Sequence, residues 1–418
     1  MIGSDLAENI SEIISGIVPA GSTKTSLHEP LFIGNEWRCV KECLDSGWVS
    51  SAGQYVDRFE KAIAQFTGAK HAIAVVNGTA ALHTCLLLAG VERGDEVIVP
   101  ALSFVATANA VTYCGAVPHF ADSEISTLGL SPARLEDYLK AISEVRSKRC
   151  INKETGRWIK AVVPMHTFGH PVDLEHLSEL CARFNLTMVE DAAESLGSYY
   201  KGRHTGLWGK LGALSFNGNK IVTTGGGGAI LTDDGDIARL AKHLTATAKL
   251  QHPWAFYHDA TGFNYRIPNI NAALGCAQLE QLPNFLEAKR ALAKHYSQAL
   301  AATEGVCFFT EPGGCKSNYW LNTLLLDKAD PRLRDAIIES LGERGIQARP
   351  AWTPLHRLPM HASCPRTDLS VAEDLEARII NIPSSARLGM ELLIKNRLPG
   401  TTLNRQGAQH EGSHPGGW

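Results

Sequence analysis

Short apolar runs alternate regularly with amphipathic segments over residues 71–191. Each apolar run is bounded by turn residues, which is typical of a buried strand, and the segments between them have apolar positions at helical spacing. We predict strands at 71–76, 95–100, 116–122, 159–167 and 186–192, and helices at 77–90, 103–115, 131–145 and 173–185. This alternation predicts an α/β fold: a mostly parallel sheet, covered by helices on both faces, with sites outside the carboxyl ends of the strands.

The pattern changes on either side of this region. Helices are predicted at 35–44 and 55–66 before it, and strands at 213–220 and 227–234 after it. A long helix is predicted at 272–298, with a break at Pro283. We therefore expect an N-terminal helical extension (1–30), a large domain (31–285), a smaller C-terminal α+β domain (286–400) and a disordered tail (401–418).

Composition and charge narrow the possible functions. The 418 residues are 44 % hydrophobic and 20 % charged, with a net charge of −3, which argues against a nucleic-acid binder with its usual basic face. We find no transmembrane stretch and no signal peptide, so we expect a cytoplasmic protein without membrane contact. The ten cysteines form no C-x-x-C pair and the sixteen histidines show no metal-ligand spacing, which predicts free, buried thiols and no metal site.

Two polar residues beside predicted strands suggest cofactor chemistry. Asp191 ends the strand in VEDAAESLG, and Lys220 follows a later strand in SFNGNK. Pyridoxal phosphate requires such a pair, because a lysine amine forms a Schiff base with it and a carboxylate keeps its pyridine nitrogen protonated. Taken singly, each residue has an ordinary interpretation: Lys220 as a solvated surface side chain, and Asp191 as a helix N-cap.

An anion site is predicted where NGTAAL follows a strand and opens a helix. The backbone N–H groups of Thr79 and Ala80 would point at an anion with the helix dipole behind them, and Ser215 can add a hydroxyl. A simple strand-to-helix turn is the alternative. The glycines 225–228 fit neither a P-loop, whose lysine follows the glycines, nor a Rossmann fingerprint, which leads into a helix. A tight hairpin beside Lys220 is predicted instead.

Six motifs occur in one order and together resemble the DegT-type sugar aminotransferase family, which has the aspartate-aminotransferase-like fold (fold type I). They are NGTAALH, LSFVATANAV, VEDAAESLG, SFNGNK, TTGGGG and GFNYRIPNINAALGCAQLEQL, and the resemblance extends over residues 32–385. It implies a pyridoxal-phosphate aminotransferase in which Lys220 is the Schiff-base lysine and proton shuttle and Asp191 pairs with the pyridine nitrogen. It also implies cofactor contacts from Gly78, Thr79, Ala80, Phe104 (on the ring face), Glu194 (near the phenolic oxygen), Ser215, Asn217 and, from a partner subunit, Asn264.

The resemblance also implies the substrates. The segments GIQARPAWTPLHRLPMH and INIPSS resemble the branch that makes 4-amino sugars for bacillosamine or legionaminic acid. We therefore expect a homodimer with shared active sites that moves an amino group from an amino acid, L-glutamate, to a UDP-linked 4-keto-6-deoxyhexose for surface-polysaccharide biosynthesis. Arg349, Trp352 and His356 are substrate-side candidates, each with a structural role as the alternative.

Three other interpretations stay open. One is a different reaction of the same cofactor, such as dehydration, which relatives with histidine in place of Lys220 perform. The second is a regulatory protein that has lost activity, and the third is a nucleotide-binding module of Rossmann type. The lysine and the aspartate argue against the second, and the position of the glycines argues against the third.

Overall fold

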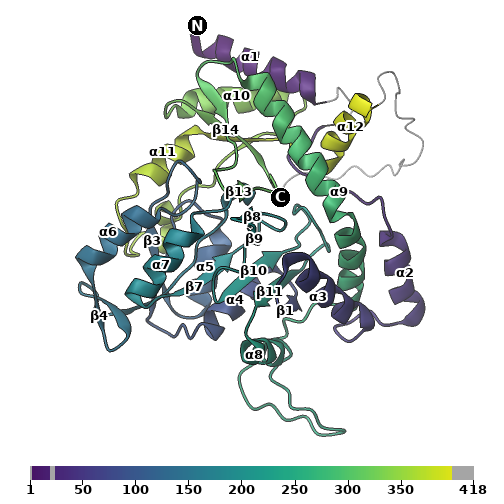
Figure 1. Ribbon diagram of the computed structural model, residues 1–418, viewed down its shortest axis with the longest axis vertical. Helices are drawn as coiled ribbons and strands as arrows, with labels where there is room; N and C mark the ends of the chain where they lie inside the picture. The colour runs from purple at the N-terminus through teal and green to yellow at the C-terminus, as the bar shows by residue number, and fades with distance from the viewer. Residues whose placement is uncertain (1, 19–23, 398–418) are drawn as a thin grey trace.

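The computed structural model describes residues 2–18 and 24–397, so the tail predicted to be disordered lies outside the described residues. Its centre is a nine-stranded sheet in the order β1-β11-β10-β7-β6-β2-β3, with β5 also pairing with β6, and β4 with β5 (Figure 1). The strands are β1 (His71–Val75), β2 (Glu96–Pro100), β3 (Val117–Ala121), β4 (Ser143–Arg146), β5 (Arg149–Asn152), β6 (Trp158–Val162), β7 (Thr187–Asp191), β10 (Leu211–Ser215) and β11 (Gly228–Thr232).

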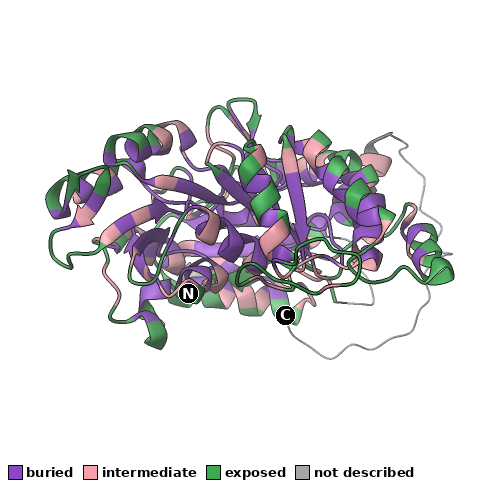
Figure 2. Ribbon diagram, turned by 90° about the horizontal axis from the view of Figure 1, so that it is seen from below, coloured by how far each residue is buried: buried purple, intermediate pink, exposed green. Residues whose placement is uncertain are grey.

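Most of this sheet is parallel, as predicted. The pairs β10–β7, β7–β6, β6–β2 and β2–β3 are parallel, whereas β11 is antiparallel to both β10 and β1. Helices cover both faces, and Figure 2 shows buried residues along the strands and exposed residues on the outer sides of the helices. The helices of this region are α2 (Glu36–Ser46), α3 (Gln54–Thr67), α4 (Gly78–Leu88), α5 (Val105–Tyr113), α6 (Pro132–Ile142), α7 (Leu174–Phe184) and α8 (Gly235–Thr245).

The two faces follow from the alternation of side chains along a strand. On β2, Val97 and Val99 belong to one hydrophobic core together with residues of α4, α5 and α8. Ile98, between them, packs in another core with residues of α6 and α7. Val97, Ile98 and Val99 are all fully buried, although they face opposite sides of the sheet. This burial on both faces explains why these strands are continuous apolar runs rather than alternating ones. The predicted α/β class is confirmed.

The C-terminal part of the chain forms a second, smaller layered unit. Its antiparallel sheet has the order β12-β14-β16-β15, and a short sheet β13-β8-β9 lies beside it. The N-terminal helix α1 packs on α10, as Figure 1 shows, and its Ile10 and Ile14 share a core with Ile337 and Leu341. The elements are α1 (Ile2–Ile17), β8 (Tyr199–Tyr200), β9 (Arg203–His204), β12 (Val306–Phe308), β13 (Cys315–Lys316), β14 (Asn322–Leu326), α10 (Pro331–Glu343), β15 (Arg349–Pro350), α11 (Ser370–Arg378), β16 (Ile379–Ile382) and α12 (Ala386–Arg397), with 3-10 turns η1 (Thr167–Gly169), η2 (Leu355–Arg357) and η3 (Pro359–His361).

The predicted helix break at Pro283 is wrong. Helix α9 runs without interruption over Asn269–Leu300, and the predicted domain boundary at 285/286 lies inside it. Proline inside a helix costs roughly 3 kcal/mol. Burial on both sides of Pro283, at Leu282 and Phe285, offsets this cost where α9 packs against α2, α3 and α12. One helix thus connects the large sheet with the smaller unit (Figure 1).

The helix predicted to end near residue 145 ends at Ile142 instead. The hydroxyl of Ser143 donates a hydrogen bond to the carbonyl of Leu139, and the chain continues into the hairpin β4–β5. Ser147 and Lys148 make the tight turn with positive φ angles of 50° and 60°, although neither is a glycine. No helix within residues 2–18 and 24–397 is long and apolar enough to cross a membrane.

Candidate active site

The loop that carries Lys220 connects two antiparallel strands, β10 and β11, as predicted. However, β10 ends at Ser215 rather than at residue 220, so the connection is longer than the predicted tight hairpin. The N–H of Phe216 donates to the carbonyl of Gly227, and the N–H of Thr224 donates to the carbonyl of Phe216. Gly225 has a φ of +77°, which glycine adopts without strain. These contacts close the loop tightly and leave 13 % of the Lys220 side chain exposed, so Lys220 is not a solvated surface residue.

Within the described part of the chain, two groups contact the amine of Lys220. Its Nζ lies 3.4 Å from Oε1 of Glu194 and 3.8 Å from the centroid of the Trp320 ring. The Trp320 indole N–H donates to the carbonyl of Asn219 over 2.7 Å, which fixes the ring against the lysine loop. Burial raises the pKa of Glu194 to about 7, and the charge of Lys220 opposes that rise. The carboxyl group of Glu194 can therefore gain or lose a proton near neutral pH.

The position of Glu194 is set from two sides. Its Oε2 accepts a hydrogen bond from the backbone N–H of Phe168 over 3.0 Å, and its backbone carbonyl accepts one from the amide of Asn318 over 2.9 Å. Phe168 has a positive φ of 55°, which is uncommon for a residue with a side chain. The carboxylate is thus fixed between a backbone amide and Lys220.

Asp191 lies at the carboxyl end of β7 and is 6 % exposed. One carboxylate oxygen accepts a hydrogen bond from the hydroxyl of Thr107 over 2.8 Å, and the other accepts from the N–H of Ala193 over 3.2 Å. Burial raises the pKa of Asp191, while Thr107, Ala193 and the charge of Lys220 lower it. No helix begins here, so the alternative interpretation of Asp191 as a helix N-cap does not hold.

The N-terminus of α4 approaches the end of β10, as an anion site requires. A Cβ on Gly78 would lie 2.8 Å from Cβ of Ser215, so only glycine permits this contact. The N–H of Ala80 is already used, because it donates to the side chain of Asn77 over 2.7 Å. The predicted use of this N–H for an anion therefore competes with a helix cap, and Thr79 is the better amide candidate.

The remaining cofactor candidates lie nearer the surface. Phe104 precedes α5 with 51 % of its surface exposed, so it is not a core residue. Its ring lies 6.4 Å from that of Trp352, which in turn lies 4.9 Å from the ring of Phe168. Asn217 and Asn264 are exposed. Trp352 thus joins the aromatic group beside Glu194, since Phe168 donates to that carboxylate.

Arg349 and His356 are the other substrate-side candidates. No contact between described residues joins either of them to Lys220. Arg349 is exposed on β15. His356 is buried and its Nε2 lies 2.9 Å from Oε1 of Glu373 on α11, which agrees with the structural alternative. The sequence interpretation missed Thr107, Phe168, Asn318 and Trp320 as neighbours of the acidic groups and the lysine. No sequence pattern at these four positions predicts these contacts.

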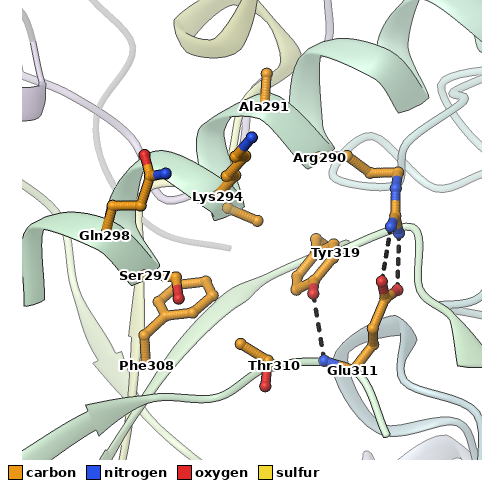
Figure 3. Close-up of a pocket in the computed structure, with 10 residues that line it drawn as sticks. Arg290, Ala291, Lys294, Ser297, Gln298, Phe308, Thr310, Glu311 and Tyr319 are labelled. Carbon is orange, nitrogen blue, oxygen red and sulfur yellow. Dashed lines mark hydrogen bonds and ion pairs between the residues drawn. The ribbon is translucent and has the colours of Figure 1, made fainter. Parts of the chain in front are cut away.

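A surface hollow of about 510 Å³ lies elsewhere, between α9 and the β12 region (Figure 3). Its walls include Lys294, Phe308 and Tyr319, and Arg290 forms a two-bond ion pair with Glu311. None of the predicted site residues lines it. Among the described residues no group of His, Cys, Asp and Glu could hold a metal ion. All ten cysteines are free; six are buried, and Cys307 is exposed.

Comparison with known proteins identifies the family. The model of the DegT/DnrJ/EryC1/StrS aminotransferase family matches residues 33–395. GDP-perosamine synthase of Caulobacter vibrioides is 38 % identical over 368 residues, covering 87 % of this chain and 94 % of that protein. GDP-perosamine synthase of Escherichia coli O157:H7 is 37 % identical over 368 residues, covering 88 % and 95 %. The solved aminotransferase TlmJ of Streptoalloteichus hindustanus has a TM-score of 0.78 at 28 % identity, covering 88 % and 100 %.

Members of this family use pyridoxal phosphate, and the residues present fit that cofactor. Lys220 supplies a largely buried amine, Asp191 supplies a buried carboxylate, and the close approach of Gly78 to Ser215 forms a cradle at the N-terminus of α4. The family model, the sequence identity to GDP-perosamine synthases and the structural similarity to TlmJ each extend over most of the chain. The chain therefore belongs to the DegT/DnrJ/EryC1/StrS family of pyridoxal-phosphate-dependent aminotransferases.

Proposed function

We propose that this aminotransferase moves the amino group of L-glutamate to a nucleotide-linked 4-keto-6-deoxyhexose, in a pathway that builds surface polysaccharide. The observation that carries the proposal is the placement of the Lys220 amine between Glu194 and the Trp320 ring. That arrangement allows one amine to bind the cofactor and to move protons. The sugar part of the proposal is supported by the relatives that are named for a sugar nucleotide.

The nucleotide is proposed to be GDP. The sequence resemblance alone favoured UDP, but three relatives at 37–38 % identity are each named GDP-perosamine synthase. Each is matched over more than nine-tenths of its length. The test of the proposed function therefore includes both GDP-linked and UDP-linked sugars.

Pyridoxal phosphate, when bound, supplies a protonated ring that accepts the electron pair left when a C–H bond of the substrate breaks. Lys220 would hold the cofactor covalently through its amine. The Lys220 amine would also be the base that moves a proton at the α carbon of the donor. Glu194, at 3.4 Å with a pKa of about 7, can accept and return the proton of that amine.

Asp191 has a different task. Its buried carboxylate would face the pyridine nitrogen and keep it protonated, because a negative charge with little water around it stabilises a nearby cation strongly. Gly78, Thr79 and Ser215 would hold the phosphate through the amides of the α4 N-terminus and a hydroxyl. Phe104 would cover one face of the ring.

The experiment separates the two half-reactions. The purified enzyme, incubated with L-glutamate alone, is expected to release one equivalent of 2-oxoglutarate per active site. It should then aminate a keto-sugar from a panel that includes GDP-, UDP- and dTDP-linked forms. No 2-oxoglutarate from any amino donor, together with water loss from a nucleotide sugar, would favour dehydration over transamination.

Replacement of Thr107 by valine tests the support of Asp191. The hydroxyl of Thr107 lowers the pKa of Asp191, so the pKa should rise in Thr107→Val. A larger fraction of Asp191 is then protonated at any acidic pH, and the acid limb of the kcat profile should move to higher pH. At neutral pH we expect kcat to fall about tenfold, from the loss of one hydrogen bond to a charged group.

Thr84→Val is the matched control for this variant. Thr84 is also buried, but its hydroxyl donates to the carbonyl of Ala80 within α4. We expect Thr84→Val to leave the pH profile where it is. An unchanged acid limb in Thr107→Val would show that this hydroxyl does not govern the ionisation of Asp191.

We further propose a two-fold dimer in which Asn264 reaches the cofactor phosphate of the partner subunit. Asn264 is exposed in its own subunit. The neighbouring loop, which extends beyond α8 in Figure 1, carries Trp254 and Phe256 with 80 % and 81 % of their surfaces exposed. Large exposed aromatic residues in one region are typical of a contact surface, and two-fold symmetry would build two identical sites from it.

Complementation tests the shared site. Mixed dimers of Lys220→Ala and Asn264→Ala subunits are expected to regain activity, because one of their two sites combines an intact Lys220 with an intact Asn264. Mixed dimers of the double variant with the unaltered chain are the control, and each of their sites carries one lesion. If tagged, verified heterodimers show the reverse order of activities, Asn264 serves its own subunit.

A further inference from the structure

A buried lysine and a partly buried histidine have no part in the proposed mechanism. The first is Lys289 on α9, which is 1 % exposed. Its Nζ donates to the carbonyl of Trp320 over 3.2 Å and to the carbonyl of Ser384. Both acceptors are neutral, and burial lowers the pKa of Lys289 to about 7. Lys289 thus contacts the backbone of Trp320, the residue whose ring lies over the amine of Lys220.

The second is His28, in the segment that leads into α2. Both of its ring nitrogens are shielded from solvent and have no hydrogen-bond partner among the described residues. The N–H of Ser384 donates to the carbonyl of Leu27 over 2.8 Å, and the N–H of Glu29 donates to the hydroxyl of Ser385 over 2.9 Å. The backbone on both sides of His28 is thus hydrogen-bonded to Ser384 and Ser385. The carbonyl of Ser384 also accepts the hydrogen bond from Lys289.

The charges of both lysines act on His28. Burial lowers the pKa of His28 well below its ordinary value, and the charges of Lys289 and Lys220 lower it further. A neutral imidazole still carries one N–H, and a buried donor without an acceptor costs roughly 1–3 kcal/mol. An anionic ligand would satisfy this N–H and offset the positive charge behind it. Glu194 is already engaged by Phe168 and Lys220.

We propose that His28, with Lys289 behind it, binds a carboxylate of the amino donor. This inference rests on the proposed function, because it concerns the ligand whose amine must replace Lys220 on the cofactor. An amino-acid donor always carries a carboxylate on the carbon that bears its amine, and L-glutamate carries a second on its side chain. Its carboxylates are therefore held close to Lys220, whereas the hexose ring of the sugar substrate carries no anionic group to match His28.

Calorimetric binding of glutarate to the holoenzyme tests this without catalysis. Glutarate has two carboxylates and no amine, so it binds but does not react. His28→Leu, which removes the N–H, is expected to weaken glutarate binding about tenfold. His28→Gln, which keeps an N–H donor, should bind within about threefold of the unaltered enzyme. His28→Gln also keeps the test valid if His28→Leu fails to fold.

His170→Leu is the matched control. The ring of His170 is also buried with unpartnered nitrogens, but it lies against the rings of Phe309 and Tyr319. We expect this variant to bind glutarate as the unaltered enzyme does. Equal weakening in His170→Leu and His28→Leu would show a general loss of structure and would overturn the assignment.

Single-turnover half-reactions identify the carboxylate and separate this inference from the proposed function. If His28→Leu raises the half-saturating concentration of L-glutamate but not of L-alanine, His28 binds the side-chain carboxylate; if it raises both, His28 binds the α-carboxylate. The inference is overturned if the unaltered enzyme forms 2-oxoglutarate and His28→Leu changes neither glutarate binding nor either donor. An unaltered enzyme that binds glutarate through His28 but forms no 2-oxoglutarate contradicts the proposed function alone.

Discussion

Lys220→Ala is expected to lower kcat by about 10⁴-fold or more, because it removes both the covalent link to the cofactor and the base that moves the proton. The fold should survive, since the Lys220 side chain contacts Glu194 and Trp320 but is not part of a hydrophobic core. Borohydride reduction followed by peptide mass spectrometry should attach the cofactor to residue 220 of the unaltered chain and to no residue of the variant.

Lys220→Arg keeps the positive charge at this position but removes the amine that acts as the base. The guanidinium keeps a cation over the Trp320 ring and beside Glu194, but it does not lose its proton in proteins and cannot act as the base. We expect this variant to be as inactive as Lys220→Ala while it keeps more of the unaltered thermal stability. Covalent trapping of the cofactor on the alanine variant would move the attachment site to another lysine.

The central sheet apart from the hairpin β4–β5 could be predicted because its information is local. Each buried strand between residues 71 and 191 is one short apolar run, and each helix between them begins with a recognisable turn. The hairpin beside Lys220 could be predicted for the same reason, since the glycines 225–228 are followed by a strand rather than by a helix.

Errors arose where distant packing or an unusual turn decides the structure. Pro283 favours a break, yet contacts of α9 with α2, α3 and α12 keep the helix whole. The turn at Ser147 and Lys148 uses positive φ angles without glycine, so nothing in the sequence separates the hairpin from the helix before it. At Ala80, the cap by Asn77 competes with the predicted anion contact for one N–H.

The residues of the candidate site also fall into those that the sequence predicts and those that it does not predict. Asp191 and Lys220 stand out because an acid and a lysine beside buried strands are a chemical pattern. Thr107, Trp320 and His28 do not stand out, because each contacts or approaches the site only after the chain has folded. Trp320 lies 100 residues beyond Lys220 in sequence, yet its ring lies 3.8 Å from the lysine amine.

Asp191→Asn is the second variant with a large expected effect. The amide is nearly the same size as the carboxylate; its oxygen can accept the hydrogen bond from the N–H of Ala193, and its NH₂ group can donate to the hydroxyl of Thr107. It cannot supply the negative charge that keeps the pyridine nitrogen protonated, so the ring loses much of its capacity to hold an electron pair. We expect kcat to fall about 10²- to 10³-fold, the range for removal of one electrostatic group that acts on the transition state.

Asp122→Asn is the control that distinguishes this electrostatic role from a structural one. Asp122 is also buried, and its carboxylate accepts hydrogen bonds from the N–H groups of Val371 and Ala372 and from Arg134. Its replacement should lower the melting temperature with little change in kcat, whereas Asp191→Asn should lower kcat with little change in melting temperature. Near-normal kcat in Asp191→Asn would mean that this carboxylate only supports the turn after β7, and that another group keeps the ring protonated.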